Sequence, residues 1–254
     1  MTLYIPGDGF LYRRHPVTKL VFMLCFACLA FLAPGYWTPL LIFAAALLPL
    51  AIFSGLVRPY GLALWRILAP LAIFLFLLHG LFNPAGQTVL FSVGSVAVKL
   101  EGVAYAGLMT GRLLCVLGAS LLLVFTTPPA SLMLGLAQHG APPWFTYIIG
   151  ATLQIIPHMR ARAAAIMAAQ QARGLETTGS LLVRARALLP MVTPLVLSAL
   201  VDAEERAIAL EARAFRSLRP KTSLVELPDP PAERMVRWVC VGCTVLVIGA
   251  GWWI

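Results

Sequence analysis

Two arginines, each preceded by an alanine, stand in the most polar part of this sequence. Arg173 lies in AAQQARG, and Arg213 lies 40 positions later in LEARAF. A guanidinium presents five N–H donors in a rigid plane, and the small alanine beside it leaves room for close approach. Two such helix ends would suit insertion into two equivalent acidic grooves on a partner. A single Ala-Arg-Gly indicates only a well-capped helix, so the doubling carries the functional interpretation.

Cysteines and histidines offer a second kind of chemistry, metal binding. Cys25 and Cys28 form one C-x-x-C pair, and Cys240 and Cys243 form another, which together match the ligand number of a structural zinc site. Phe, Val and Leu surround both pairs, so we interpret these cysteines as small apolar packing residues. No ligand spacing on one helix face joins the histidines, which are His15, His79, His139 and His158. We therefore expect no metal ion and no cofactor.

Carboxylates near the second Ala-Arg could in principle serve as an acid–base pair. They alternate with arginines at helical spacing, which favours ion pairs within one helix; the residues are Asp202, Glu204, Glu205 and Glu211, with Arg206 and Arg213. The sequence also lacks H-E-x-x-H, G-x-S-x-G and the phosphate-binding G-x-x-x-x-G-K-[ST]. These observations predict a chain that is not an enzyme and binds no nucleotide itself.

The elements that position these residues must be those of an integral membrane protein. Hydrophobic residues make up 60% of the 254 positions and charged residues only 11%. The apolar residues form runs close to the ~20 residues that a helix needs to cross a bilayer. The fold class is therefore all-α and polytopic, with about five membrane-spanning helices, at 19–34, 38–57, 65–82, 103–126 and 236–254. This pattern divides the chain into 1–127, a cytoplasmic or interfacial helical region at 128–233, and a last span at 234–254.

Basic residues orient these spans. Arg13, Arg14 and Lys19 precede the first span, and the other clusters are Arg58 with Arg66 and Arg234 with Arg237. All lie on the cytoplasmic side if the N terminus is inside and the C terminus outside. The same clusters account for the net charge of +9 without nucleic acid, for which the sequence has no binding motif.

Two features of the spans remain open at this point. Arg112 falls within the fourth span, where facing lipid would cost ~2.5–3.5 kcal/mol, so it should face protein or water. It would then either brace the helical region or extend toward an interface. The segment 83–102 lies on the outer face, and its alternating Val and Ser residues indicate a hairpin or a re-entrant piece.

The order of motifs along the chain resembles a known family. Between Leu11 and Leu224 it is similar to the transmembrane T component of energy-coupling factor (ECF) transporters, which include cobalt-transport permeases; the motifs are HPVTKL, Arg112, VFTTPPASL, IIPHMR, AAQQARG, LLP, ALEARAF and RPKTSL. The resemblance implies that Ala172, Arg173 and Gly174 form a first ATPase-coupling motif. It implies that Ala212, Arg213 and Ala214 form a second, within a cytoplasmic coupling domain between the fourth and fifth spans.

The resemblance also implies partners and a location. These are two ABC ATPase subunits and a substrate-binding S component, in a multi-pass protein of a bacterial or archaeal cell membrane that imports a vitamin or a transition-metal ion. Apolar stretches at 143–157 and 188–201 are candidates for a sliding surface against the S component. The alternatives are a self-sufficient secondary transporter or a membrane enzyme, for which the spans offer only Arg112 as a charged residue at membrane depth.

The second motif departs from the family pattern. Ala214 stands where the family often has glycine, and alanine is the strongest helix former. We therefore expect the second helix to continue through Phe215 and Arg216.

Overall fold

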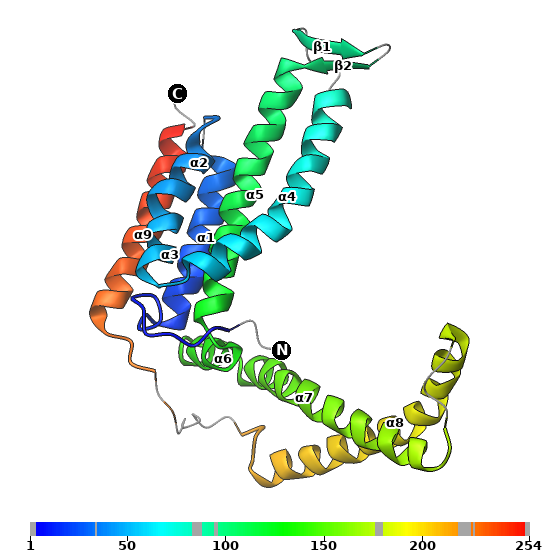
Figure 1. Ribbon diagram of the computed structural model, residues 1–254. Helices are drawn as coiled ribbons and strands as arrows, with labels where there is room; N and C mark the ends of the chain where they lie inside the picture. Colours follow the sequence, from blue (N-terminus) through cyan, green and yellow to red (C-terminus); the bar gives the residue numbers. More distant parts are fainter. Residues whose placement is uncertain are drawn as a thin grey trace. The chain divides into compact units, whose positions relative to one another are not determined.

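Figure 1 shows a computed structural model of the chain, which describes residues 4–33, 35–82, 88–93, 96–175, 180–217, 225 and 227–251. They belong to two compact units. The first comprises Met1–Gly140 and Leu227–Ile254, and the second comprises Ala141–Glu226.

The first unit is a helical bundle with one hairpin. Its elements are α1 (Pro16–Leu32), α2 (Thr38–Ile42), the π-helical η1 (Phe43–Leu47), α3 (Leu48–Phe53), α4 (Val57–Phe82), β1 (Val89–Val93), β2 (Val96–Lys99), α5 (Leu100–Thr126), α6 (Pro129–Gln138) and α9 (Pro231–Gly251). β1 pairs with β2 antiparallel, so the hairpin interpretation of this segment is confirmed. Apart from this hairpin the described fold is all-α, as predicted.

Helix α5 lies at the centre of the first unit, with α1, α2 and α4 packed against it. Small residues on its buried face make this possible, among them Gly111, Cys115 and Ala119. A Cβ at Gly118 would lie 2.5 Å from the hydroxyl oxygen of Tyr60 on α4, so glycine is required for this close approach. The core therefore depends on small side chains in α5 that let long apolar side chains from its neighbours reach inward.

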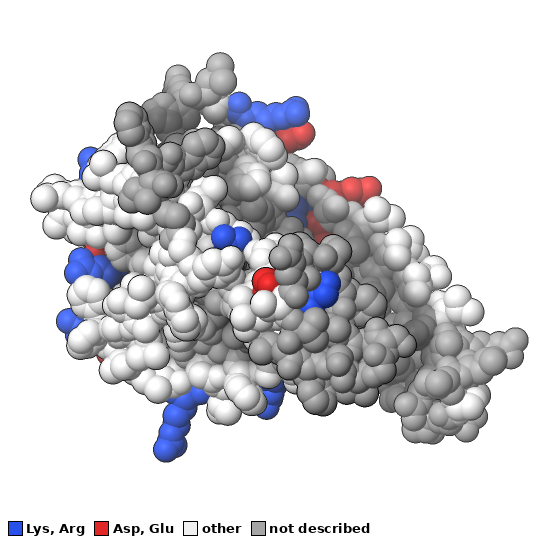
Figure 2. All heavy atoms as spheres, turned by 90° about the horizontal axis from the view of Figure 1, so that it is seen from above, with Lys and Arg blue, Asp and Glu red and all other residues white. Residues whose placement is uncertain are grey.

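Each of the five predicted spans is mostly helical, but the first two end earlier than predicted, since α1 ends at Leu32 and α3 ends at Phe53. Among the described residues, two helices are both long and apolar enough to cross a membrane, Val57–Gly80 and Leu100–Thr126. α1 and the run Thr38–Phe53 are apolar but shorter. Uncharged residues also cover most of the described surface on the face seen in Figure 2. The number of helices that span the bilayer remains a prediction.

Polar side chains gather where α1 and α9 begin and α5 ends. Lys19 Nζ donates to the carbonyl oxygen of Thr126 at 3.0 Å. Arg14 Nη1 donates to Glu233 Oε1 at 3.0 Å, which joins the start of α9 to the segment before α1. Because Lys19 and Glu233 are almost fully buried, these partners offset the cost of removing their charges from water.

The second unit consists of α7 (Pro143–Ala172) and α8 (Leu181–Ala212). Both helices pass from an apolar stretch to a C-terminal end that is rich in alanine and charge, and in α8 this apolar stretch follows Arg184 and Arg186. α8 changes direction along its length in Figure 1 and contains Pro190 and Pro194, which each remove one backbone hydrogen bond.

Candidate functional site

The first Ala-Arg pair closes helix α7 with a Schellman motif. Ala172 is the last helical residue, Arg173 is the C-cap, and Gly174 has φ +90°. The backbone N–H of Leu175 donates to the carbonyl of Gln170 at 3.0 Å, and that of Gly174 donates to Gln171 at 2.9 Å. These two bonds satisfy carbonyls that the helix leaves without partners. Gly174 therefore has the capping role predicted for it.

The second Ala-Arg pair closes helix α8 in the same way. Ala212 is the last helical residue, and the N–H of Phe215 donates to the carbonyl of Leu210 at 3.0 Å. The N–H of Ala214 donates to Glu211 at 2.9 Å, and Ala214 has φ +52°. Our expectation that the helix would continue through Phe215 and Arg216 is wrong, because the alanine adopts the left-handed conformation that glycine has in the first motif.

The contact of Phe215 explains why an alanine accepts this conformation. The Phe215 ring lies 5.1 Å from the ring of Tyr147, near the start of α7, at 54°. An aromatic contact of this kind contributes ~0.5–1.5 kcal/mol, which is comparable with the ~1–2 kcal/mol cost of a left-handed alanine. Packing between the two helices therefore offsets the local preference of Ala214 for a helix.

Exchanging the residues at the two caps should have opposite effects on stability. Ala214→Gly should stabilise the protein by about 0.5–1 kcal/mol, because glycine removes the left-handed strain and loses some of that gain to unfolded-state entropy. Gly174→Ala should destabilise it by a similar amount, since a Cβ there meets no atom within 4 Å and only the backbone conformation opposes it. Thermal unfolding in detergent measures both. A lower midpoint for Ala214→Gly would contradict this account of the second cap.

An ion pair and an aromatic contact join the α7 and α8 segments and together show that the two helices run antiparallel. Arg162 Nη1 of α7 binds Asp202 Oδ2 of α8 and also donates to the carbonyl of Ser198 at 3.4 Å. Tyr147, near the start of α7, contacts Phe215, just after the end of α8. Residues early in α7 therefore lie beside residues late in the α8 segment, and the two helices run in opposite directions. The two Ala-Arg ends therefore lie at opposite ends of the pair (Figure 1).

The ion pair lies the same distance along the chain from both ends. Arg173 follows Arg162 by 11 residues, and Arg213 follows Asp202 by 11 residues. At 1.5 Å per residue, each end is roughly 16 Å from the ion pair along its own helix. This pairing was not predicted from the sequence, where helical spacing favoured ion pairs of Asp202 with arginines of its own helix. Among the described residues the carboxylates of α8 make no ion pair with Arg206 or Arg213.

Both helices expose large apolar side chains in their first halves. In α7, Trp144 is 60% exposed and Ile148 54%. In α8, Leu189 is 70% exposed and Val192 52%. An apolar surface of this extent is typical of a protein–protein or membrane contact.

The predicted intramembrane arginine lies in the first unit. The Arg112 guanidinium carbon is 5.8 Å from the centroid of the Phe31 ring, so α5 holds it over an aromatic face of α1. Its Nε is buried without a hydrogen-bond partner among the described residues. This environment agrees with the expectation that Arg112 faces protein, while its role as a brace remains a prediction.

The side-chain types that a metal ion would need are not gathered in the described part of the chain. No group of three or more His, Cys, Asp or Glu that could hold a metal ion occurs among those residues. The cysteines there are all free.

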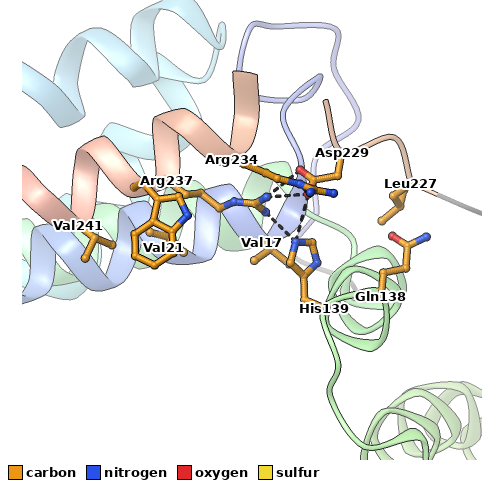
Figure 3. A pocket seen from close by; sticks show the side chains of 10 residues that line it. Val17, Val21, Gln138, His139, Leu227, Asp229, Arg234, Arg237 and Val241 are labelled. Carbon is orange, nitrogen blue, oxygen red and sulfur yellow. Dashed lines mark hydrogen bonds and ion pairs between the residues drawn. The ribbon is translucent and has the colours of Figure 1, made fainter. Parts of the chain in front are cut away.

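A polar cluster in the first unit was not foreseen from the sequence (Figure 3). Asp229 accepts two bonds from Arg237 Nη2, at 2.7 and 2.8 Å, and one from Arg234 Nε at 3.1 Å. Burial raises the pKa of the Asp229 carboxyl, but the hydrogen bonds from both arginines outweigh it and lower the pKa overall. Asp229 is therefore ionised at neutral pH.

His139, at the end of α6, completes this cluster. Its Nδ1 lies 2.9 Å from the carbonyl of Gly135, and its Nε2 lies 3.0 Å from Arg237 Nη1. We assign the neutral tautomer with the proton on Nδ1, because Nε2 must then accept from Arg237. The 3.3 Å separation of Nε2 from Asp229 Oδ2 would be an ion pair only if the ring were protonated.

The imidazole of His15 lies near that of His139, with 5.2 Å between ring centroids and 56° between the ring planes. Burial is the largest influence on the His15 pKa and lowers it, although the Asp229 carboxylate opposes this effect. His15 is thus neutral at physiological pH. Three parts of the sequence meet here, the starts of α1 and α9 and the end of α6, and no local spacing links them.

Comparison with known proteins gives consistent matches over most of the chain. Residues 8–224 match the family model described as cobalt transport protein (CbiQ). The chain is 36% identical to the energy-coupling factor transporter transmembrane protein EcfT of Brevibacillus brevis, covering 98% of this chain and 96% of the relative. Proteins of the same name from Listeria innocua and Bacillus subtilis are 31% and 30% identical, over 92% and 88% of this chain and 88% and 87% of theirs.

Proposed function

Since this chain belongs to the cobalt transport protein (CbiQ) family and is a transmembrane T component of energy-coupling factor transporters, we propose that it transmits ATP-driven movement between its partners. Two ABC ATPase subunits would supply the movement. A substrate-binding S component in the membrane would receive it and release a vitamin or a transition-metal ion to the cytoplasm. The chain itself would catalyse no reaction.

The observation that carries this proposal is the pair of matching helix ends. Two Schellman motifs place Arg173 and Arg213 in equivalent positions at the ends of α7 and α8. Both side chains are exposed, and neither takes part in an ion pair of the described chain. Two exposed guanidiniums at equivalent helix ends suit two equivalent acidic grooves, which a dimer of ATPases would provide.

Each residue type of the two motifs has its own role in this proposal. Arg173 and Arg213 would make charge-assisted bonds in the ATPase grooves, and Ala172 and Ala212 would leave space for the groove walls. Gly174 and Ala214 would turn the chain away at each end. Arg112 would stabilise the bundle from within rather than contact a partner.

The exposed apolar halves of α7 and α8 support the contact with the S component. Such a surface has no directional bonds, so a partner can slide or tilt on it at little cost. Transmission also requires that the partners bind two states of the complex unequally, since equal binding shifts no equilibrium. A change in the ATPase dimer would move Arg173 and Arg213, and the apolar faces would move with them.

Topology follows the same proposal. Five spans would place the N terminus inside and the C terminus outside, giving a multi-pass protein of a bacterial or archaeal cell membrane. The regions would be 1–127, the coupling region 128–233 with its two motifs, and the last span 234–254.

Co-purification tests the proposal directly. The affinity-tagged chain, extracted from its native membrane, should retain two ATPase subunits, identical or paralogous, together with a small substrate-binding membrane protein. The chain alone should show no ATP hydrolysis. Uptake of substrate by the chain alone in vesicles would instead favour a secondary transporter and overturn the proposal.

A further inference from the structure

A pocket of about 670 Å³ in the first unit lies over the polar cluster of Asp229 (Figure 3). Helices α1, α6 and α9 and the segment before α9 line it, all within one compact unit. Its volume falls within the range of small-molecule sites in proteins. The coupling proposal gives this pocket no role.

The lining of the pocket changes from polar to apolar along α9. Arg234 and Arg237 come first, in the opening turns of the helix, followed by Trp238 and then Val241. Val241 lies seven residues beyond Arg234, which is roughly 10 Å along the helix axis. Val21 of α1 lines the same apolar part. The pocket is thus amphiphilic, with cationic groups at the helix start and aliphatic groups deeper along the helix.

The charges of the polar end do not balance. Arg234 and Arg237 share the single carboxylate of Asp229, and His139 is neutral in the tautomer assigned above. Nearby, Glu233 is already paired with Arg14. One positive charge therefore remains without a counter-charge. Arg234 is the more accessible of the two arginines, because its side chain is 68% exposed and its two Nη atoms have no partner among the described residues.

A phosphodiester with an attached acyl chain fits both ends of this pocket. Its single negative charge would neutralise the excess cation through bonds from Arg234 Nη1 and Nη2. The acyl chain would cover Val21 and Val241, which a free phosphate would leave exposed to water. Trp238 is 76% exposed and lies between the two, as amphipathic rings do at a membrane–water interface.

We propose that this pocket binds an acidic phospholipid of the cytoplasmic leaflet, with the phosphodiester on Arg234 and the start of an acyl chain between α1 and α9. The proposal rests on the membrane orientation given under Proposed function, which puts the starts of α1 and α9 on the cytoplasmic side. A zwitterionic lipid is a poorer ligand, because its headgroup adds a further cation beside Arg234 and Arg237. Lipid bound here bridges the first and last helices of the bundle.

Native mass spectrometry of the purified complex tests this site. With phosphatidylglycerol and phosphatidylcholine at equal concentration, the wild-type complex should retain the acidic lipid about tenfold more than the zwitterionic one. Arg234→Gln should reduce this preference about tenfold, the effect of losing a charge-assisted contact. Val241→Phe should also reduce retention, since it fills the apolar part and leaves every charge in place.

Arg58→Gln is the matched control, because Arg58 is an exposed arginine on the same expected side of the membrane and lies outside the pocket. It should keep the preference of the wild type. Unchanged retention in Arg234→Gln, or equal loss in Arg58→Gln, would overturn the proposal. Displacement of the lipid by an equal concentration of inorganic phosphate would show a simple anion site instead. Co-purification of the ATPases from the same preparation separates failure of this site from failure of the coupling function.

Discussion

Replacing Arg173 and Arg213 together by alanine should abolish both retention of the ATPases and uptake of substrate. Each guanidinium is expected to make a charge-assisted contact worth about 1.5–3 kcal/mol, which corresponds to roughly 10- to 150-fold in affinity. The Schellman bonds at both ends involve backbone atoms only, so the helix caps should survive both substitutions. The double mutant therefore removes the guanidinium contacts with the ATPases and leaves the two helix ends folded.

The single mutants should separate assembly from transport. With Arg173→Ala or Arg213→Ala, the remaining end can still hold the ATPases, so much of the complex should be recovered in a pull-down. Uptake should fall further than assembly, because moving the S component requires both ATPases to act on this chain at the same time. Lysine at either position should restore only part of the activity, since a point charge cannot make a planar bidentate contact.

Arg160→Ala provides a matched control for these variants. Arg160 is exposed on α7 and loses the same charge, but it lies before the helix end. It should leave ATPase retention and uptake near wild-type values. Wild-type uptake in the Arg173→Ala, Arg213→Ala double mutant would end the coupling proposal.

Hydropathy was sufficient to locate the two long apolar helices of the first unit. The runs at 65–82 and 103–126 fall within α4 and α5, since an apolar run of that length leaves few alternatives to a helix. Gly174 was likewise correctly assigned as a cap, because glycine after a helical run is a local and specific stop signal.

The end of the second helix was not predictable from local preference. Alanine favours continuation of a helix, whereas the contact of Phe215 with Tyr147, 68 positions earlier, helps to account for the left-handed Ala214. The pairing of Asp202 with Arg162 was missed for the same reason. Arg206 lies one turn from Asp202 in sequence, whereas Arg162 comes close only when two helices pack.

The pocket residues were interpreted only as charges. The positive-inside rule used Arg234 and Arg237 to orient the last span. It could not show that both would converge on Asp229, or that His139, 90 positions before Asp229, would join them. Contacts between segments that lie far apart in the sequence cannot be recognised from the spacing of residues along the chain.

Reversing one charge of the Arg162–Asp202 pair should uncouple transport without removing the ATPases. The pair lies 11 residues from each Ala-Arg end, so it fixes how α7 and α8 cross and hence how far apart Arg173 and Arg213 lie. The side chains are 31% and 27% exposed. Breaking the pair should therefore cost about 1–2 kcal/mol, below the 3–5 kcal/mol of a fully buried pair.

Arg162→Asp places two carboxylates in contact, and Asp202→Arg places two guanidiniums in contact. Either change should reduce uptake at least tenfold, because ends that are no longer held at a fixed separation cannot follow both ATPases at once. Each Arg-bearing end remains intact, so pull-down of the ATPases should fall by much less. The combination Arg162→Asp with Asp202→Arg restores opposite charges and should recover a substantial part of the uptake.

The separation of the ends gives a readout that a general loss of stability would not produce. Spin labels at Ala169 and Ala209, two exposed positions one turn before the ends, should give a narrow distance distribution in the wild type by pulsed electron paramagnetic resonance. The distribution should broaden in each single reversal and narrow again in the combined variant. If the two single variants lose uptake with an unchanged distribution, the pair acts on stability alone and does not set the geometry of the coupling ends.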